Sequence, residues 1–541
     1  MVAIAGCGGS AAPTTASASA SGQGGAAAQS TASAAATGSA AATAPQRGGT
    51  LTVALNSDPP GLDPMWQTAT VTQDVDINVV EQLFTFDKNN GFTPLLVDSY
   101  TVSPDGKTFI FKLRQGVLFQ DGSEMTSADV LASFQRWEAL SSRAQALLQN
   151  MTAATAPDPS TFEVQFSQPN GAFISALAIP NQQMFILEKK QIDQFMSGGK
   201  YQQIPGAQLI GTGPYKIQSW QPGRELDLVR FDKYVSPSGP TNGLAGTRHA
   251  YVDTIKYMTV PDPASTLAGL AAGQYDVAYT LPTSLYSEVQ AQSGLVPEIV
   301  KPGSSPVAVF NKKQGPFTSV ALRQAAWYAI DPAKVMAGAI DNKAFYSMNP
   351  SLADQNWAVW YNDTAGASVY TGAPDVAKAK QLLQQAGYSG QQLTWITTKD
   401  YDYMYNSALV ASQEMQQAGL NVKLQVYDWP TLVSMRNNPK DYDIFSTGIG
   451  FVGDPTGTAA FTPGWPGWFD DSENNANYQA LTTTVDPAKR VQLAAQQQTI
   501  FWDKLPYLQF GHMYNFRAYR SSVQNMINGP VFALFNVGIK P

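Results

Sequence analysis

The chain contains 541 residues, of which 44% are hydrophobic and only 14% are charged, and its formal net charge is −7. This length is enough for several domains and more than one hydrophobic core, and the acidic balance does not favour a nucleic-acid partner. The single cysteine, Cys7, excludes an intramolecular disulfide and a cysteine-built metal site, and the sequence has no run of about 18 apolar residues to span a membrane.

Residues 1–7 read MVAIAGC, and Ile4-Ala5-Gly6-Cys7 resembles the lipobox of bacterial lipoproteins, in which the cysteine is lipidated. Only six residues precede Cys7, fewer than the basic region and apolar core of about 7–15 residues in a secretory signal. Either the true start lies upstream or Cys7 is an ordinary free cysteine. We expect a residual lipoprotein signal, because of the segment that follows.

Residues 8–46 consist almost wholly of Gly, Ala, Ser, Thr and Gln, with two prolines. This composition cannot bury enough apolar surface to fold, so it predicts a disordered tether. A single acyl chain anchors weakly, so stable attachment requires more than one. The expected location is the cell membrane, lipid-anchored on the extracytoplasmic face.

Folded sequence is predicted from Arg47 onward. Thr50–Leu55 is expected to be a strand, and a helical segment is expected around Val75–Leu83. Residues 211–215, GTGPY, contain a GxG, but a proline and a strand follow it instead of a helix. A phosphate-binding loop is therefore disfavoured.

Residues 88–206 are expected to form an inserted unit. Ser103-Pro104-Asp105-Gly106 predicts a turn before the alternating strand Thr108–Leu113. Thr126 and Asp129 match a capping box, and the helix that begins there carries three apolar residues on one face, Val130, Phe134 and Trp137.

The stretch Pro306–Asp331 is predicted to be a strand over 306–310, a break over 311–316 and then a helix. The apolar positions at helical spacing are Leu322, Ala325, Ala326, Ala329 and Ile330. Asp331-Pro332 is suited to cap and start a further helix.

Two βαβ patterns lie on either side of this stretch. The first has strands at Ile255–Val260 and Tyr275–Tyr279, with a helix containing Leu267, Leu270 and Ala271 between them. The second has strands at Leu393–Thr397 and Val422–Tyr427 around a helix at Tyr405–Ala418. Each pattern implies a parallel strand pair with a right-handed crossover. Two such units argue for two α/β lobes on either side of a cleft.

Several stretches resemble family 5 (oligopeptide-type) extracellular solute-binding proteins of bacterial ABC importers, in the order of that family. They are GGTLTVAL…GLDP, SPDGKTFIFKLRQGVLFQDGSEMTSADVLASFQR, GTGPY, residues 306–331, PDVAKAKQLLQQAGY and KLPYL at 504–508. The resemblance implies an α/β periplasmic-binding-protein-like two-lobe fold of class II, cluster C type, with an extra inserted α+β domain. The implied division is lobe I at 47–87, 207–305 and 506–541, inserted domain II at 88–206, and lobe II (domain III) at 306–505.

The resemblance also implies a function, that of an extracytoplasmic receptor that captures a small solute between two closing lobes. The implied partners are a peptide or oligosaccharide ligand, an ABC permease and a separate ATPase. We expect a monomer with no cofactor, no nucleic acid and no enzymatic activity.

Catalytic signatures are not found: the sequence lacks GxxxxGK[ST], HExxH and GxSxG motifs. His249 and His512 are far apart, so each is expected to be a packed or surface histidine; family members that bind nickel complexes do use histidine. Asp470-Asp471 or Asp400 and Asp402 are imaginable as a glycosidase pair, but adjacency in sequence does not set the required separation. A secreted hydrolase therefore stays a distant alternative.

Aromatic residues gather in loops rich in Gly, Pro, Asn and Asp in the second half of the chain. They are Trp357, Trp360, Tyr361, Tyr401, Tyr403, Tyr405, Trp465 and Trp468. Flat apolar faces with polar tips suit a cleft that binds sugars, peptides or other amphipathic solutes. The alternative is that some of them belong to satellite cores. We take Trp357, Tyr401, Tyr403, Trp465 and Trp468 as ligand-binding candidates.

The segment 447–456, TGIGFVGDPT, bears on specificity. The resemblance implies that peptide-binding relatives have an aspartate four residues before the proline of this segment, and that this aspartate pairs with the ligand's α-ammonium. This chain has Phe451 at that position. Losing that partner costs about 2–5 kcal/mol, which favours an oligosaccharide or opine-type ligand over ordinary peptides. Asp454 is a further candidate whose alternative role is turn structure. Lys399 is a candidate for a ligand carboxylate, or an ordinary loop lysine.

Overall fold

A computed structural model describes residues 45, 47–66, 69–178, 184–370, 373–529 and 531–540. The described residues belong to one compact unit, Pro45–Pro541. Cys7 and the predicted tether up to residue 44 lie outside the described residues. No helix in the described part of the chain is both long enough and apolar enough to cross a membrane.

The described strands form five sheets. The largest has 12 strands, ten of which follow the order β10-β11-β12-β1-β13-β20-β14-β18-β16-β17. Its members are β1 (Thr50–Leu55), β10 (Tyr215–Gln221), β11 (Glu225–Arg230), β12 (Thr254–Thr259), β13 (Val277–Leu281), β14 (Leu295–Phe310), β15 (Tyr346–Ser347), β16 (Leu393–Thr397), β17 (Val422–Val426), β18 (Ile444–Gly450), β19 (Tyr507–Gln509) and β20 (His512–Arg520). β15 pairs with β20, and β19 pairs with β14.

The smaller sheets are a four-stranded one in the order β4-β5-β7-β6 and three two-stranded ones. Their strands are β2 (Phe84–Phe86) with β3 (Phe92–Pro94), β4 (Val97–Val102), β5 (Thr108–Leu113), β6 (Met151–Asp158), β7 (Thr161–Phe166), β8 (Met196–Ser197) with β9 (Lys200–Tyr201), and β21 (Val523–Gln524) with β22 (Gly538–Ile539).

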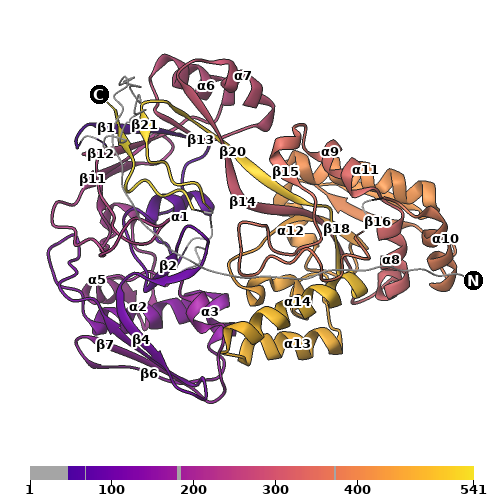
Figure 1. The fold of residues 1–541 in the computed structure, drawn as a ribbon, viewed down its shortest axis with the longest axis horizontal. Helices are drawn as coiled ribbons and strands as arrows, with labels where there is room; N and C mark the ends of the chain where they lie inside the picture. The colour runs from indigo at the N-terminus through magenta and orange to yellow at the C-terminus, as the bar shows by residue number, and fades with distance from the viewer. Residues whose placement is uncertain are drawn as a thin grey trace, which may run out of the picture. The chain divides into compact units, whose positions relative to one another are not determined.

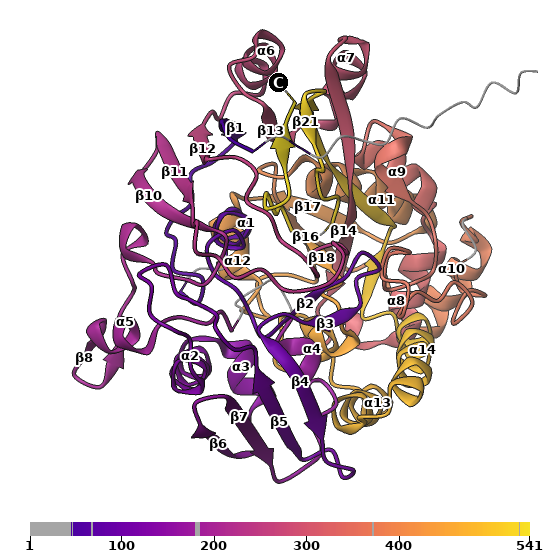
Figure 2. The same cartoon turned by 60° about the vertical axis from the view of Figure 1, so that its left-hand side comes forward.

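The described helices flank these sheets, as Figures 1 and 2 show. They are α1 (Thr70–Asp76), α2 (Ser127–Leu140), α3 (Ser142–Leu147), α4 (Phe173–Ala176), α5 (Lys189–Gln194), α6 (Pro263–Ala272), α7 (Tyr286–Ala291), α8 (Val320–Tyr328), α9 (Pro332–Ala339), α10 (Val376–Gln385), α11 (Asp402–Ala418), α12 (Trp429–Met435), α13 (Ser472–Thr483) and α14 (Pro487–Lys504).

The 16-residue strand β14 is the centre of the large sheet. Its first part, Leu295–Val300, pairs antiparallel with β20, and its last part, Ser304–Phe310, pairs antiparallel with β18. The predicted strand at 306–310 is confirmed but is the end of a longer one. The helix α8 follows as predicted, and Asp331 accepts hydrogen bonds from the backbone N–H groups of Ala333 and Lys334 at the start of α9. One continuous sheet therefore carries the chain from one half of the molecule to the other (Figure 1).

The two predicted βαβ units differ in how their strands meet. β16 and β17 pair directly and in parallel, as expected. β12 and β13 are parallel as well, but β1 lies between them and pairs with both. The sequence pattern predicted that β12 and β13 pair with each other, but in the structure β1 is inserted between them. Such an insertion depends on contacts between residues more than 200 positions apart.

The prediction of a helix around Val75–Leu83 is wrong, because the helix α1 ends at Asp76. Beyond it the chain extends along the GTGPY segment: the N–H of Gly213 donates to the Val79 carbonyl, and the N–H of Tyr215 donates to the Asn78 carbonyl. A Cβ at Gly211 would lie 2.2 Å from the Val79 carbonyl oxygen. GTGPY is thus a site of close backbone approach, which accounts for its glycines without a phosphate ligand.

Replacing Gly211 with alanine is expected to lower the free energy of unfolding by about 1–3 kcal/mol, because the added methyl group overpacks this contact. Urea unfolding followed by circular dichroism measures the change. Gly464→Ala is the control, because a Cβ at Gly464 meets no atom within 4 Å; its effect should stay within about 0.5 kcal/mol. Equal effects of the two substitutions would contradict the close approach.

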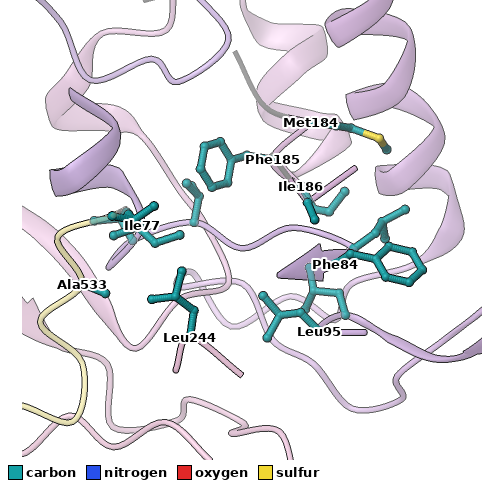
Figure 3. Close-up of a cluster of buried hydrophobic side chains, with 14 of the residues drawn as sticks. Ile77, Phe84, Leu95, Met184, Phe185, Ile186, Leu244 and Ala533 are labelled. Carbon is teal, nitrogen blue, oxygen red and sulfur yellow. The ribbon is translucent and has the colours of Figure 1, made fainter. Parts of the chain in front are cut away.

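Hydrophobic side chains form two core clusters. The first is made of residues from 51 to 277 with Ala353, Trp357 and the segment 523–537, and the second is made of residues from 267 to 518. Figure 3 shows part of the first cluster, in which Ile77, Phe84, Leu95 and Leu244 come together from separate segments. The predicted capping box at α2 is present, since the N–H of Thr126 donates to the Asp129 carboxylate over 2.8 Å.

Candidate functional site

Phe451 follows directly on the end of β18 and borders a small cavity. Its ring centroid lies 5.6 Å from that of Trp357, and the side chain is half-buried. The cavity has a volume of about 20 Å³ and its walls include Ser305 of β14, Trp360 and Tyr507 of β19. A space of this size holds about one water molecule. Residues from five separate segments therefore converge beside the position that the sequence singled out.

The walls of this cavity carry no charged side chain. They are Ser305, Leu352, Ala353, Trp360, Ile449, Phe451, Pro455, Thr458, Phe461, Ala494, Gln497, Gln498, Tyr507 and Gln509. Amide and hydroxyl groups of this kind both donate and accept hydrogen bonds. The arrangement suits a neutral polar group and offers no counter-charge to an ammonium or a carboxylate.

His512 holds the polar end of this region. Its Nε2–H donates to the Ser351 carbonyl over 2.9 Å, and its Nδ1 accepts from the Ser305 hydroxyl over 3.2 Å. Burial lowers the pKa of His512 below its ordinary value, although the nearby Asp354 opposes the shift. His512 is therefore a packed, neutral histidine, as expected, and it positions Ser305.

The buried His512 should make stability depend on pH. Because its pKa is lowered in the folded state, the unfolded chain binds the proton more readily, so the contribution is present above about pH 6.5 and is lost as the pH falls toward the lowered value. His512→Gln keeps a donor and an acceptor but does not titrate. Thermal unfolding from pH 8 to pH 5 should show wild type losing stability relative to His512→Gln. A constant difference over that range would contradict this role.

Asp454 lies in a buried ion pair with Arg490 of α14. Nη2 of Arg490 contacts the two carboxylate oxygens of Asp454 at 2.8 Å and 2.6 Å. One of those oxygens also accepts from the N–H of Thr456, so Asp454 caps the short 3-10 helix Pro455–Gly457. The carboxylate is thus engaged on several sides, which favours the turn-structure alternative for Asp454 over direct ligand contact.

Trp357 is buried, with 2% of its surface exposed, and it belongs to the first core cluster. Its ring meets Phe86 of β2 edge to face at 5.4 Å. Beside it, Nδ2 of Asn90 donates to the Asn356 carbonyl over 2.7 Å. Trp357 therefore joins the loop 350–362 to the N-terminal part of the chain, and only its contact with Phe451 brings it to the cavity.

Tyr403 and Tyr401 lie at the start of α11, near the strand that leads to Phe451. The Tyr403 hydroxyl would be 2.7 Å from a Cβ at Gly448 of β18. Burial raises the pKa of Tyr403 above its ordinary value, so its hydroxyl stays protonated. Tyr401 is exposed and stacks edge to face on Trp429 at 5.3 Å. Lys399 is exposed, and its Nζ lies 4.7 Å from the ring centre of Tyr405.

Trp465 and Trp468 form a separate group. Trp465 packs at 5.7 Å from Phe445, near the start of β18, and Trp468 stacks on Tyr442 at 6.2 Å. Phe445 and Phe451 are six residues apart, which is roughly 20 Å along a strand. The structure therefore does not bring these two tryptophans to the cavity.

The carboxylates weighed as a glycosidase pair have local structural partners. Asp471 caps α13 through the N–H groups of Glu473 and Asn474, and Asp400 accepts from the N–H of Trp429 over 2.7 Å. Among the described residues no group of three or more His, Cys, Asp or Glu is placed to hold a metal ion.

Sequence reasoning missed most of the cavity wall. Ser305, Tyr507 and Gln509 lie on β14 and β19, which pair in the sheet, and their side-chain neighbours are set by that pairing. Trp360 was noted among the loop aromatics but not selected; its indole N–H donates to the Gly453 carbonyl over 2.9 Å. Its place within three residues of Trp357 was the one available signal.

Comparison with known proteins finds one matching family model and several similar solute-binding proteins. The family model described as "Bacterial extracellular solute-binding proteins, family 5 Middle" matches residues 91–471. A "Probable peptide ABC transporter periplasmic-binding protein y4tO" of Sinorhizobium fredii is 28% identical over 494 residues, which cover 88% of this chain and 91% of that protein. The glutathione-binding protein GsiB of Escherichia coli K12 is 27% identical over 486 residues, 85% of this chain and 88% of that one.

Solved structures agree on the fold. The protein AgaA of A. tumefaciens R10, in complex with agropinic acid, has a TM-score of 0.73 and 26% identity, covering 91% of this chain and 99% of that one. The substrate-binding protein CtaP of Listeria monocytogenes has a TM-score of 0.79 and 20% identity, covering 92% of this chain and 100% of that one. These neighbours share the α/β two-lobe fold that the sequence predicted, which is thereby confirmed.

Proposed function

Because this chain belongs to the bacterial extracellular solute-binding proteins of family 5, we propose that it captures a neutral, hydrogen-bonding solute at Phe451. The receptor role in an ABC importer follows from the family; the solute class is the proposal. We propose further that no bond is made or broken and that the protein works as a monomer. The solute is then passed to a permease driven by a separate ATPase.

The single observation that carries the proposal is the charge-free cavity beside Phe451. At about 20 Å³ it is far smaller than the roughly 300–1,000 Å³ of a small-molecule site. A solute can therefore enter only if the walls separate, and it is enclosed when they return. Contacts that exist only in the closed arrangement then favour closure, which is a population shift.

Hydrogen bonds between the predicted inserted domain II and lobe II can hold the closed arrangement together. Nη2 of Arg143 donates to the Gly457 carbonyl over 3.3 Å, and the N–H of Gly171 donates to the Thr482 carbonyl over 2.7 Å. Both join residues of 88–206 to residues of 306–505, the predicted inserted domain II and lobe II. We propose this division, with lobe I at 47–87, 207–305 and 506–541, as the set of parts that move.

The proposed class of solute follows from the lack of a free carboxylate beside the cavity. Phe451 offers no carboxylate, and the neighbouring Asp454 is engaged by Arg490. An oligosaccharide meets these neutral donors and acceptors better than a peptide ammonium does. The complex of AgaA with agropinic acid supports an opine-type ligand, whereas y4tO, named as a probable peptide transporter component, supports the peptide alternative.

Membrane attachment is a further part of the proposal. Lipidation at Cys7, followed by the tether 8–46, would hold the receptor at the extracytoplasmic face near its permease. The support is the lipobox-like Ile4-Ala5-Gly6-Cys7 and the composition of the tether.

Native mass spectrometry of protein purified without denaturation, followed by thermal unfolding with neutral oligosaccharides, opines and peptides, tests the function. A ligand at 100 times its Kd should stabilise by about 2.7 kcal/mol. Selective stabilisation by neutral solutes without turnover is the expected result. Released hydrolysis products would overturn the receptor role, and stabilisation by free-amino peptides alone would overturn the solute class.

A further inference from the structure

A second, much larger pocket lies at the seam between the four-stranded sheet and α14. Its volume is about 640 Å³, within the range of small-molecule sites. One wall comes from the N-terminal part of the chain and includes Tyr100 and Val102 of β4 and Ile174 of α4. The other wall comes from Val359, Trp360 and the start of α14. The four-stranded sheet and α14 lie near each other in both views (Figures 1 and 2).

Exposed apolar side chains concentrate at this pocket. Among the described residues nine large hydrophobic side chains are exposed, and four of them line it: Tyr100, Val359, Val485 and Val491. Scattered exposed apolar residues are ordinary, but a cluster on the walls of a cavity marks a binding surface. Val359 is 52% exposed, the most of the nine.

The charged side chains on the pocket wall indicate which kind of ligand the pocket can bind. The charged side chains on the pocket wall are Asp454 and Arg490, which neutralise each other in their buried ion pair. The remaining polar groups at its edge are neutral, among them Asn90, Ser103 and Ser175. A charged ligand would lose its hydration here without meeting an unpaired opposite charge, because the two charges on the wall already form an ion pair.

We propose that this pocket is a second ligand site, which takes an uncharged, mainly apolar small molecule. Trp360 lines both this pocket and the cavity at Phe451, so the two sites are neighbours that share one side chain. A molecule in the second site touches both walls at once and therefore favours the arrangement in which the walls meet. The proposal does not depend on which solute the cavity at Phe451 takes.

The chain offers two closely matched positions for a test. Ala488 is the second residue of α14, after the N-cap Asp486, and it lines the pocket. Ala377 is the second residue of α10, after the N-cap Asp375, and it is also exposed. Ala488→Trp should fill the pocket, whereas Ala377→Trp adds the same ring at the same helical position elsewhere.

The experiment titrates the full chain with N-phenyl-1-naphthylamine, a neutral apolar fluorophore. Wild type should bind one molecule per chain saturably, Ala488→Trp should weaken binding at least tenfold, and Ala377→Trp should leave it unchanged. No saturable binding by wild type, or equal losses in the two variants, would overturn the proposal. Circular dichroism checks folding.

A second pair of variants decides the matter if Ala488→Trp does not fold. Val485 and Val376 are 37% and 38% exposed, but only Val485 lines the pocket. Val485→Glu places a charge in the apolar wall and should weaken fluorophore binding at least tenfold. Val376→Glu should have no effect, and an equal effect of both would count against the site.

Discussion

Replacing Asp454 with alanine is expected to lower the free energy of unfolding by about 3–5 kcal/mol, because it leaves a buried guanidinium without its carboxylate. The side chains of Arg490 and Asp454 are only 5% and 2% exposed. Among the described residues Nη1 of Arg490 already has no hydrogen-bond partner, so Asp454 is the only acceptor there that pairs with this guanidinium. Urea unfolding at neutral pH measures the loss.

Two controls separate the buried pair from ordinary surface charge. In the double variant Asp454→Ala/Arg490→Met, removal of both charges should restore most of the lost stability. Asp193→Ala breaks an exposed pair with Lys189 and should cost less than about 1 kcal/mol. If Asp454→Ala costs no more than Asp193→Ala, Arg490 is not held as a buried charge by this carboxylate.

Introducing a carboxylate at Phe451 is expected to change ligand preference. Phe451→Asp should improve the affinity for peptides with a free α-ammonium by about 30-fold to several thousand-fold, since a desolvated ammonium–carboxylate pair contributes about 2–5 kcal/mol. The cavity walls contain no other charge to compete for the ammonium. Isothermal titration with a dipeptide and its N-acetylated form measures the gain, which should appear only for the free amine.

Phe451→Asn is the matched control, because it removes the same ring and its contact with Trp357 but adds no charge. It should not gain peptide affinity. If wild type already binds free-amino peptides tightly and Phe451→Asp gains nothing over Phe451→Asn, residue 451 does not select against peptides.

Elements set by short-range pattern could be predicted from the sequence. The strands at 50–55, 108–113 and 393–397 have the predicted bounds, because alternation and turn residues lie within a few positions of each strand. The helix expected at 75–83 was wrong, because the carbonyls of Asn78 and Val79 accept hydrogen bonds from the N–H groups of Tyr215 and Gly213, more than 130 positions away. No local signal reports such a contact.

The candidate site could be predicted only in outline. The departure at Phe451 was visible, because one position could be set against the family pattern. The cavity was not, since its walls meet through the pairing of β14 with β18 and β19. The ion pair of Asp454 with Arg490 spans 36 positions, and Trp357 is a core residue whose loop gave no periodic signal. Loop position alone does not separate ligand-binding aromatics from packed ones.

The position of β14 in the large sheet has a consequence for how the chain can be cut and rejoined. Backbone ladders to β18, β19 and β20 hold this strand from both sides along much of its length. The two halves of the molecule are therefore joined by hydrogen-bonded strands as well as by the covalent chain. If the chain were cleaved in an exposed loop, these strand pairs would keep the two halves associated. The protein is therefore suited to circular permutation and to split-reporter sensors of solute capture.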